Sequence, residues 1–418
     1  MKQLLSTICF VSFGLILTST TNGQQNLSET QLQKLLNRFL GADANGDGVL
    51  SNDEFLAARD KFRAQRNRNG RGGVKRDFKA HPGWDLDRFP DDAVCYKSPE
   101  EIKALFAKVK TGKQPAVASF PKPKDGALRI VGIGHSFMMP GYKTLPLISR
   151  GAGMTQPLYT HVGGGMKGSA RYKWEQENGI FQFEGKPLPK LLAAIANAEW
   201  DAMMFGPYFK DRPVYYSCWI DFCLKHNPEM KFYISDAWPQ LAKVEPRPTS
   251  EDYFTEDVIN KLGKEKRENF AALFESLAKA YPGKVFVVPT SDAMVLAAKQ
   301  FVRGELPGIE GLHRVIGKQE RSLWKDQIGH LGPGLERLEG YVFYSTLYGR
   351  SPEQIDRKIK FGGNGKFPSD DLDQIFRNIA WQAVKEHPNT GVTDKNGDGL
   401  NDSASKVSSQ SDSNRQKN

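Results

Sequence analysis

Short apolar stretches alternate with amphipathic ones along the central part of the chain. The apolar stretches cover about 128–133, 158–162, 200–207, 231–238 and 284–290. Apolar residues recur at helical spacing over about 188–198, 213–226, 251–280, 293–302, 335–348 and 372–386. Buried strands that alternate with amphipathic helices favour a parallel sheet covered on both faces. We therefore predict an α/β fold over residues 77–388, a three-layer sandwich with a mostly parallel sheet.

Three segments outside residues 77–388 differ from this pattern. Residues 1–23 contain one early lysine, an apolar run and then small polar residues, which is the pattern of a signal peptide. The apolar run is too short to span a bilayer comfortably, and no later stretch is long and apolar enough. Residues 65–76 predict a flexible basic linker, and residues 389–418 predict a disordered tail. We expect a secreted or periplasmic protein with no membrane span.

The 418 residues have the composition of a soluble globular protein, with 39% hydrophobic and 25% charged residues. Much of the basic excess behind the net charge of +10 lies around the predicted linker, so the charge does not indicate a nucleic-acid partner. Cys9 lies in the predicted signal peptide, which leaves Cys95, Cys218 and Cys223. A disulfide that joins Cys95 to one of the other two and buried free thiols are both compatible with the sequence. The sequence does not fix the oligomeric state.

The stretch DANGDGVLSNDE, within a predicted helix-loop-helix over residues 28–64, fills every position of the EF-hand calcium loop. Amphipathic helices are predicted on both sides, and Gly48 stands where the loop turns sharply. Oxygen atoms occur at all the ligand positions, which are Asp43, Asn45, Asp47, Val49 through its carbonyl, Ser51 through water, and Glu54. Ca²⁺ prefers such hard oxygen ligands, so we predict a Ca²⁺ site here. The alternative is an Asx-rich turn between two helices.

A partial copy of this loop, DKNGDGLND, lies at residues 394–402 in the predicted tail. Asp394, Asn396 and Asp398 occupy the first three ligand positions, but Ser405 stands where the loop needs its bidentate glutamate. Ca²⁺ binding and a solvated polar segment are both open at this loop.

The stretch IVGIGHSFMMPG, residues 130–141, ends a predicted buried strand with a serine in a turn. In an open α/β fold such a turn lies at the carboxyl edge of the sheet, where binding sites form. Backbone N–H groups of the turn and of a following helix can stabilise an oxyanion there. A nucleophilic Ser136 needs a base, and His330, with Asp326 close to it in sequence, is the candidate. The alternative is that Ser136 caps a helix that begins near Phe137.

On these residues the chain resembles an SGNH/GDSL-type hydrolase over about 127–352. The serine of that family follows the first strand in a Gly-Asp-Ser-like block, here Gly134-His135-Ser136. Its acid and base precede the last helix of the domain, where this chain has Asp326 and His330. The resemblance implies a three-layer α/β sheet and a serine esterase in which His330 is the base and Asp326 orients it.

The chain departs from the family pattern in two blocks. The family spaces Asp and His three apart, whereas Asp326 and His330 are four apart, so either a bulge brings Asp326 to the imidazole or the site is a Ser–His dyad. The resemblance implies an oxyanion-hole N–H from Gly164 or Gly165, after the second strand. Tyr208 stands where the family has its oxyanion-binding Asn, so either the tyrosine O–H donates or the hole has two donors.

These observations predict a secreted calcium-binding protein whose α/β domain hydrolyses acyl esters. The substrate class is a small-molecule or polysaccharide ester, with polysaccharide deacetylation as the example that the resemblance implies. The alternative is a catalytically silent calcium-binding protein whose α/β domain binds glycans or proteins. Trp238, Trp324 and Tyr208 fit either a sugar-binding cleft or the core.

Overall fold

The structure is a computed structural model, and it describes residues 118–162, 168, 172, 181–183, 186–188, 190–208, 211–238, 241, 244–245, 247–361 and 367–402. The chain divides into two units, Met1–Asp77 and Phe78–Asn418, and all the described residues belong to the second. The predicted signal peptide, EF-hand loop and basic linker lie outside the described residues, and so do Cys95, Gly164 and Gly165.

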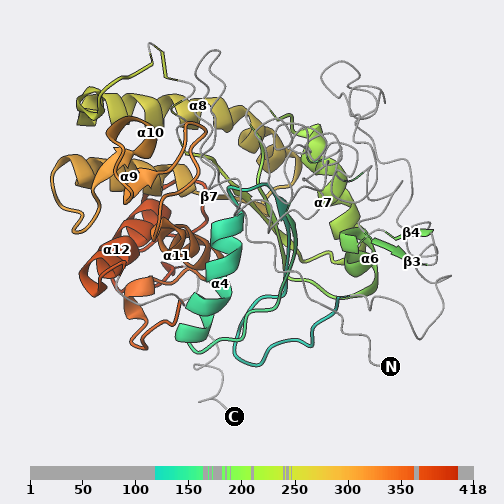
Figure 1. Ribbon diagram of the computed structural model, residues 1–418. Helices are drawn as coiled ribbons and strands as arrows, with labels where there is room; N and C mark the ends of the chain where they lie inside the picture. Colours follow the sequence, from blue (N-terminus) through green and yellow to red (C-terminus); the bar gives the residue numbers. More distant parts are fainter. Residues whose placement is uncertain are drawn as a thin grey trace, which may run out of the picture. The chain divides into compact units, whose positions relative to one another are not determined.

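Five parallel strands form the central sheet in the order β2-β1-β5-β6-β7. In Figure 1 the sheet lies in the middle of the described part of the chain, with helices on both sides. The strands are β1 (Ile130–Gly134), β2 (Leu158–Val162), β5 (Ala202–Phe205), β6 (Lys231–Ser235) and β7 (Val285–Val288). In the register of β1, Ile130 lies opposite Leu158 on β2 and Ala202 on β5. β1 and β5 are buried along their whole length, which explains their continuous apolar sequences. The predicted α/β fold with a mostly parallel sheet is confirmed.

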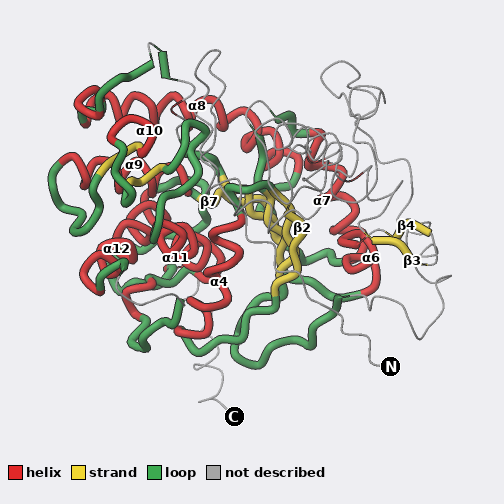
Figure 2. The backbone as a smooth tube through the Cα atoms, in the orientation of Figure 1, coloured by secondary structure: helices red, strands yellow, loops and turns green. Residues whose placement is uncertain are grey.

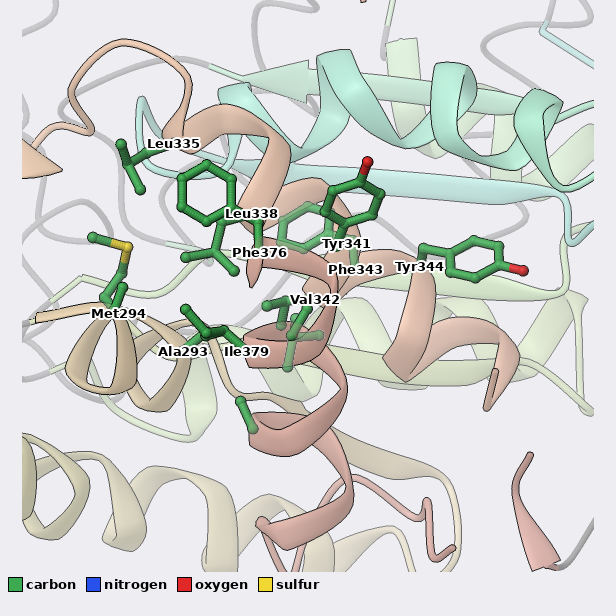
Figure 3. Close-up of a cluster of buried hydrophobic side chains, with 14 of the residues drawn as sticks. Ala293, Met294, Leu335, Leu338, Tyr341, Val342, Phe343, Tyr344, Phe376 and Ile379 are labelled. Carbon is green, nitrogen blue, oxygen red and sulfur yellow. The ribbon is translucent and has the colours of Figure 1, made fainter. Parts of the chain in front are cut away.

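Helices cover both faces of the sheet, which gives three layers (Figure 2). One face carries α4 (Met139–Gly151), α9 (Thr290–Val302), α11 (Leu335–Tyr348) and α12 (Asp370–Glu386). The other face carries α6 (Lys190–Asn197), α7 (Val214–His226) and the C-terminal part of α8 (Glu256–Ala280). Successive residues of β1 pack into opposite cores, Ile130 into the first and Val131 into the second. Figure 3 shows part of the first core, where side chains of α9, α11 and α12 meet.

Two element boundaries coincide with the predicted ones, those of β2 and α11. The helix α4 is not predicted from periodicity, because Pro140, Gly141 and Pro146 lie within it and interrupt the helical pattern. The predicted helical stretch 251–280 is divided into η4 (Glu251–Tyr253) and α8. Other short elements are not predicted: β3 (Phe181–Phe183), β4 (Lys186–Leu188), β8 (Gly311–His313), α10 (Arg314–Gly317), β9 (Ser322–Trp324) and η5 (Pro352–Gln354). β3 pairs with β4 in antiparallel fashion, and β8 pairs with β9 in parallel.

The order of the strands reverses at β1. The chain passes from β1 to β2 on one side of it, and the next strand of the sheet, β5, lies on the other side. Helices that leave such a switch point on opposite faces open a crevice outside the carboxyl ends of the strands. The turn that follows β1 therefore lies at the position where this fold class forms its sites.

The close packing of α4 on α11 fixes the elements next to that turn. A Cβ on Gly340 would lie 2.1 Å from Oγ1 of Thr144, so glycine permits the two helices to approach. The backbone N–H of Gly141, in the first turn of α4, donates to the Glu339 carboxyl on α11 at 2.8 Å. Burial raises the pKa of Glu339 well above its usual value.

Candidate active site

Ser136 lies in the turn between β1 and α4, at the carboxyl edge of the sheet. The strand before it is buried, whereas Ser136 is exposed. The turn closes with a hydrogen bond from the Met138 N–H to the His135 carbonyl at 3.0 Å. The helix begins at Met139 and has Met138 as its N-cap, without a capping side chain. Ser136 therefore does not cap this helix, and its hydroxyl is free for another role.

Asp326 and His330 lie at the two ends of a hairpin loop that follows β9. The Lys325 N–H donates to the His330 carbonyl at 2.9 Å, which closes the loop. Gly329 has a φ of 93°, a left-handed conformation that glycine adopts readily. The hairpin returns the chain on itself and brings two residues four positions apart face to face. The departure from the family's spacing is thus accommodated by loop geometry.

The structure brings Ser136, His330 and Asp326 into one hydrogen-bonded chain. His330 Nε2 lies 2.6 Å from Ser136 Oγ, and His330 Nδ1 lies 2.7 Å from Asp326 Oδ2. A ring nitrogen beside a carboxylate carries the proton, so we assign the proton to Nδ1. Nε2 is then left as an acceptor for the Ser136 hydroxyl. The hydroxyl and the imidazole belong to residues 194 positions apart, so only the tertiary fold joins them.

Asp326 is held in place by its own loop. Its Oδ1 accepts the backbone N–H groups of Ile328, Gly329 and His330 at 3.2, 3.1 and 3.1 Å. Burial raises the pKa of Asp326, but the side-chain and backbone hydrogen bonds from His330 outweigh burial and leave the pKa below its usual value. The carboxylate is therefore charged at neutral pH, which favours the proton on His330 Nδ1.

Two backbone N–H groups are predicted to form the oxyanion hole, that of Ser136 and that of Gly164 or Gly165. Within the described part of the chain, the Ser136 N–H donates no hydrogen bond and is available to a substrate oxygen. Gly164 and Gly165 lie outside the described residues, so their N–H groups stay predicted donors.

The end of β5 lies against the serine turn. A Cβ on Gly206 would lie 2.4 Å from the Met138 side chain, so a glycine is needed for this close approach. Tyr208, in the position of the family's Asn, donates its backbone N–H to Asp211 Oδ2 at 2.8 Å. The Tyr208 ring stacks on His135 with 4.2 Å between ring centroids. The backbone of Tyr208 is therefore used within its own loop, and its ring covers the neighbour of the serine.

His135 connects the segments that follow the neighbouring strands β1 and β5. Its Nε2 lies 3.0 Å from the Pro207 carbonyl oxygen, and its Nδ1 accepts the Phe137 N–H at 3.3 Å. Because a carbonyl only accepts, Nε2 carries the proton and the ring is neutral. His135 is 6% exposed, and it has a structural role beside Ser136.

Aromatic side chains of the core pack beside the hydrogen-bonded residues Ser136, His330 and Asp326. Trp238 and Trp324 are 1% and 5% exposed, so both belong to the core. The Phe137 ring stacks on Trp238 at 4.6 Å and meets the His330 ring edge to face at 5.2 Å. The Trp238 indole N–H donates to the carbonyl of Gly329. Sequence reasoning missed this connection, although Trp238 follows β6 at the same edge of the sheet.

Among the residues that the structure describes, no group of three or more His, Cys, Asp or Glu side chains is arranged to hold a metal ion. In the partial loop, Asp394 Oδ2 accepts the Trp381 indole N–H at 3.0 Å and the Gly399 N–H at 3.2 Å. Asp398 Oδ1 accepts the Leu400 N–H at 2.8 Å. These carboxylates therefore stabilise their own loop. The predicted EF-hand ligands lie outside the described residues.

Two further features bear on the predictions. Within the described ranges, no helix is long and apolar enough to cross a membrane. Cys218 is partly buried and Cys223 is buried, and both are free thiols.

Comparisons with known proteins do not assign this chain to a family. No protein-family model and no curated protein matches it. A solved structure that resembles it weakly is that of a DUF4886 family protein from Bacteroides uniformis ATCC 8492, with a TM-score of 0.40 and 12% sequence identity. The similarity covers 62% of this chain and 95% of that one.

Proposed function

We propose that this protein is a secreted, calcium-binding serine ester hydrolase of the SGNH type. One observation carries the proposal: His330 lies 2.6 Å from the Ser136 hydroxyl and 2.7 Å from the Asp326 carboxylate. These are the distances that a nucleophile, a base and an orienting group need. The exposed serine and the buried strand before it are consistent with a nucleophile presented to a substrate.

Acyl transfer to water follows from this arrangement. His330 Nε2 takes the Ser136 proton as Oγ attacks the ester carbonyl, and Asp326 stabilises the imidazolium that forms. His330 then gives the proton to the leaving alcohol as the C–O bond breaks, which leaves an acyl-serine. Water, deprotonated by His330, then attacks the acyl-serine. The bond between the acyl carbon and Ser136 Oγ breaks, His330 returns the proton to Oγ, and the carboxylic acid leaves. The Ser136 N–H and the N–H of Gly164 or Gly165 hold the oxyanion in both halves.

The class of substrate is an acyl ester of a small molecule or a polysaccharide. Met139 follows Ser136 by three positions, and Ile328 lies between Asp326 and His330; they are 37% and 45% exposed. Exposed apolar residues this close in sequence to the catalytic residues suit the acyl part of an ester, and an exposed serine suits a bulky alcohol part such as a sugar chain.

The calcium part of the proposal rests on the EF-hand loop. Asp43, Asn45, Asp47 and Glu54 supply the side-chain oxygens, with Val49 and Ser51 at the remaining ligand positions. Calorimetry with Ca²⁺ on the full chain should give a binding heat that Glu54→Ala removes. Equal heats for the two proteins would contradict the site. The predicted signal peptide would make extracellular Ca²⁺ available to this loop.

Hydrolysis of a chromogenic acetyl ester tests the enzymatic part. The wild-type protein should hydrolyse the ester, and Ser136→Ala should reduce the rate to the uncatalysed level, with its unfolding midpoint unchanged. An equal rate for the two proteins would contradict the proposal.

A second function is favoured by one observation. Tyr208 stands where the SGNH/GDSL pattern has its oxyanion-binding Asn, and its ring stacks on His135 with 4.2 Å between centroids. A domain without the Asn side-chain donor fits a catalytically silent protein that binds glycans or proteins. Negligible ester hydrolysis together with glycan binding that Ser136→Ala leaves unchanged would support this function instead.

A further inference from the structure

We propose that Trp238 is a positioning residue that couples the serine turn to the hairpin of the base. This inference rests on the proposed esterase function and adds a residue to its site. Trp238 follows β6, so it reaches the site from a strand that carries neither the serine nor the base.

Trp238 makes one contact with each half of the site. Its indole N–H donates to the carbonyl of Gly329, the residue before His330. Its ring stacks on Phe137, the residue after Ser136, with 4.6 Å between centroids and 22° between planes. One side chain therefore touches the immediate neighbours of both the nucleophile and the base.

Phe137 completes the connection. Its ring meets the His330 imidazole edge to face, at 5.2 Å and 88°. The imidazole thus has a carboxylate on Nδ1, a hydroxyl at Nε2 and an aromatic ring against its side. Rotation of the imidazole out of the chain would break all three contacts.

The hairpin needs such support because much of it faces solvent. Gln327 is exposed and Ile328 is 45% exposed. The loop's own hydrogen bonds hold Asp326 relative to His330, but they do not fix the loop relative to Ser136. Trp238 is only 1% exposed, so it is anchored in the core and can hold the hairpin at a fixed distance from the serine turn.

An ordinary core tryptophan would have the same burial, so the test compares Trp238 with a second one. Trp200, which precedes β5, is 3% exposed, and its indole N–H donates to the Ala194 carbonyl at 3.0 Å. Phe substitution at either position removes one buried indole donor from a backbone carbonyl. Trp200 belongs to the core on the opposite face of the sheet and lies at the amino end of its strand, so Trp200→Phe is the matched control.

Kinetics on the full chain give the first readout. Trp238→Phe should lower kcat for an acetyl ester about tenfold to a hundredfold, with KM within about twofold, because small displacements of catalytic groups cost rates of this size. The rate at which a fluorophosphonate labels Ser136 should fall by the same factor. Trp200→Phe should change neither rate by more than about twofold, while both variants lose similar melting temperature. Equal kcat values for the two variants would overturn the proposal.

The second readout requires no activity. The His330 Nδ1 proton, held at the Asp326 carboxylate, should give a low-field resonance that His330→Ala removes and thereby assigns. The resonance should persist in Trp200→Phe and broaden or vanish in Trp238→Phe through faster exchange. An unchanged resonance in Trp238→Phe would overturn the positioning role. A wild-type protein without hydrolysis or labelling would overturn the proposed esterase instead, and the resonance would still decide the role of Trp238.

Phe137→Leu supplies a second variant if Trp238→Phe does not fold. It removes the ring between Trp238 and His330 and keeps an apolar side chain. The same loss of kcat and of the resonance is expected, and wild-type values for both would overturn the proposal.

Discussion

Replacement of Asp326 by asparagine keeps the shape of the side chain and changes the chemistry of one atom. In the wild-type protein Oδ1 accepts three backbone N–H groups and Oδ2 accepts the His330 Nδ1–H. In Asp326→Asn the amide oxygen must occupy the Oδ1 position, because an NH₂ group there would face three donors. Each unpaired donor would cost about 1–3 kcal/mol where it is buried, so the orientation of the amide is determined.

The amide NH₂ group then faces His330 Nδ1. Two donors cannot share a hydrogen bond, so Nδ1 gives up its proton and accepts from the amide. The imidazole proton moves to Nε2, which lies 2.6 Å from Ser136 Oγ. In this tautomer Nε2 donates to the serine and has no lone pair with which to take the serine proton.

The expected loss in kcat is about 10³–10⁴, the size found when a triad imidazole is held in the wrong tautomer. This corresponds to about 4–5.5 kcal/mol of transition-state stabilisation. The assay is kcat for a chromogenic acetyl ester at saturating substrate, with Ser136→Ala as the lower limit. Because the pKa of Asp326 lies below its usual value, the wild-type carboxylate is charged at neutral pH, where the comparison is made.

Urea unfolding provides the control, since both proteins should keep the three backbone hydrogen bonds to this side chain. A variant that retains more than about a tenth of the wild-type kcat would refute the reasoning. Such a result would mean that Ser136 and His330 act as a dyad and that Asp326 serves only to fold the hairpin.

Three further predictions concern the supports of the site. Gly329→Ala should lose about 1–2 kcal/mol of unfolding free energy and part of kcat, because φ is 93° there and the hairpin must shift; urea unfolding and ester kinetics measure the two effects. Burial, and then the charge of Asp292, raise the pKa of Asp236 to about 7. The folded state therefore holds a proton that the unfolded state releases, and the unfolding free energy should fall by up to about 1.4 kcal/mol per pH unit between about pH 4 and pH 7. Asp236→Asn should make this slope less steep, because the contribution of Asp236 is removed, and an identical slope in the variant would contradict the assignment. Asp373→Ala should cost about 3–5 kcal/mol of unfolding free energy, because the buried carboxylate binds Arg337 at 3.0 Å and a second arginine, Arg377, at 3.1 Å; kcat should stay at the wild-type value in conditions where the variant is folded.

The alternation of elements is readable from the sequence because it is a local property. Each strand of the sheet is a short apolar stretch, and each long helix repeats its apolar residues every three or four positions. The prediction fails where local signals conflict, as in α4, whose prolines and glycine belong to turns in most sequences. It also fails for β8 and β9, which are three residues long and carry no periodicity.

The candidate site, like the fold, is predicted only in part by the sequence. Ser136 is recognisable because a buried strand ends in a turn at that point. His330 is recognisable because it precedes the predicted helix that ends the resemblance to the SGNH/GDSL-type hydrolases. The spacing of Asp326 and His330 leaves a triad and a dyad equally open in the sequence. The left-handed Gly329 and the closure of the hairpin by Lys325 bring the carboxylate to the imidazole, and neither feature is encoded by spacing.

The sequence by itself determined the strands of the central sheet and most of the long helices, where the candidate nucleophile stands, and which loop has the oxygen pattern for Ca²⁺. The tertiary structure decided the strand order that reverses at β1, the contact between Ser136 and His330, and the place of Trp238 between them. The physical reason is range: periodicity and turn chemistry act over a few residues, whereas contacts between distant segments depend on how the whole sheet and its helices pack.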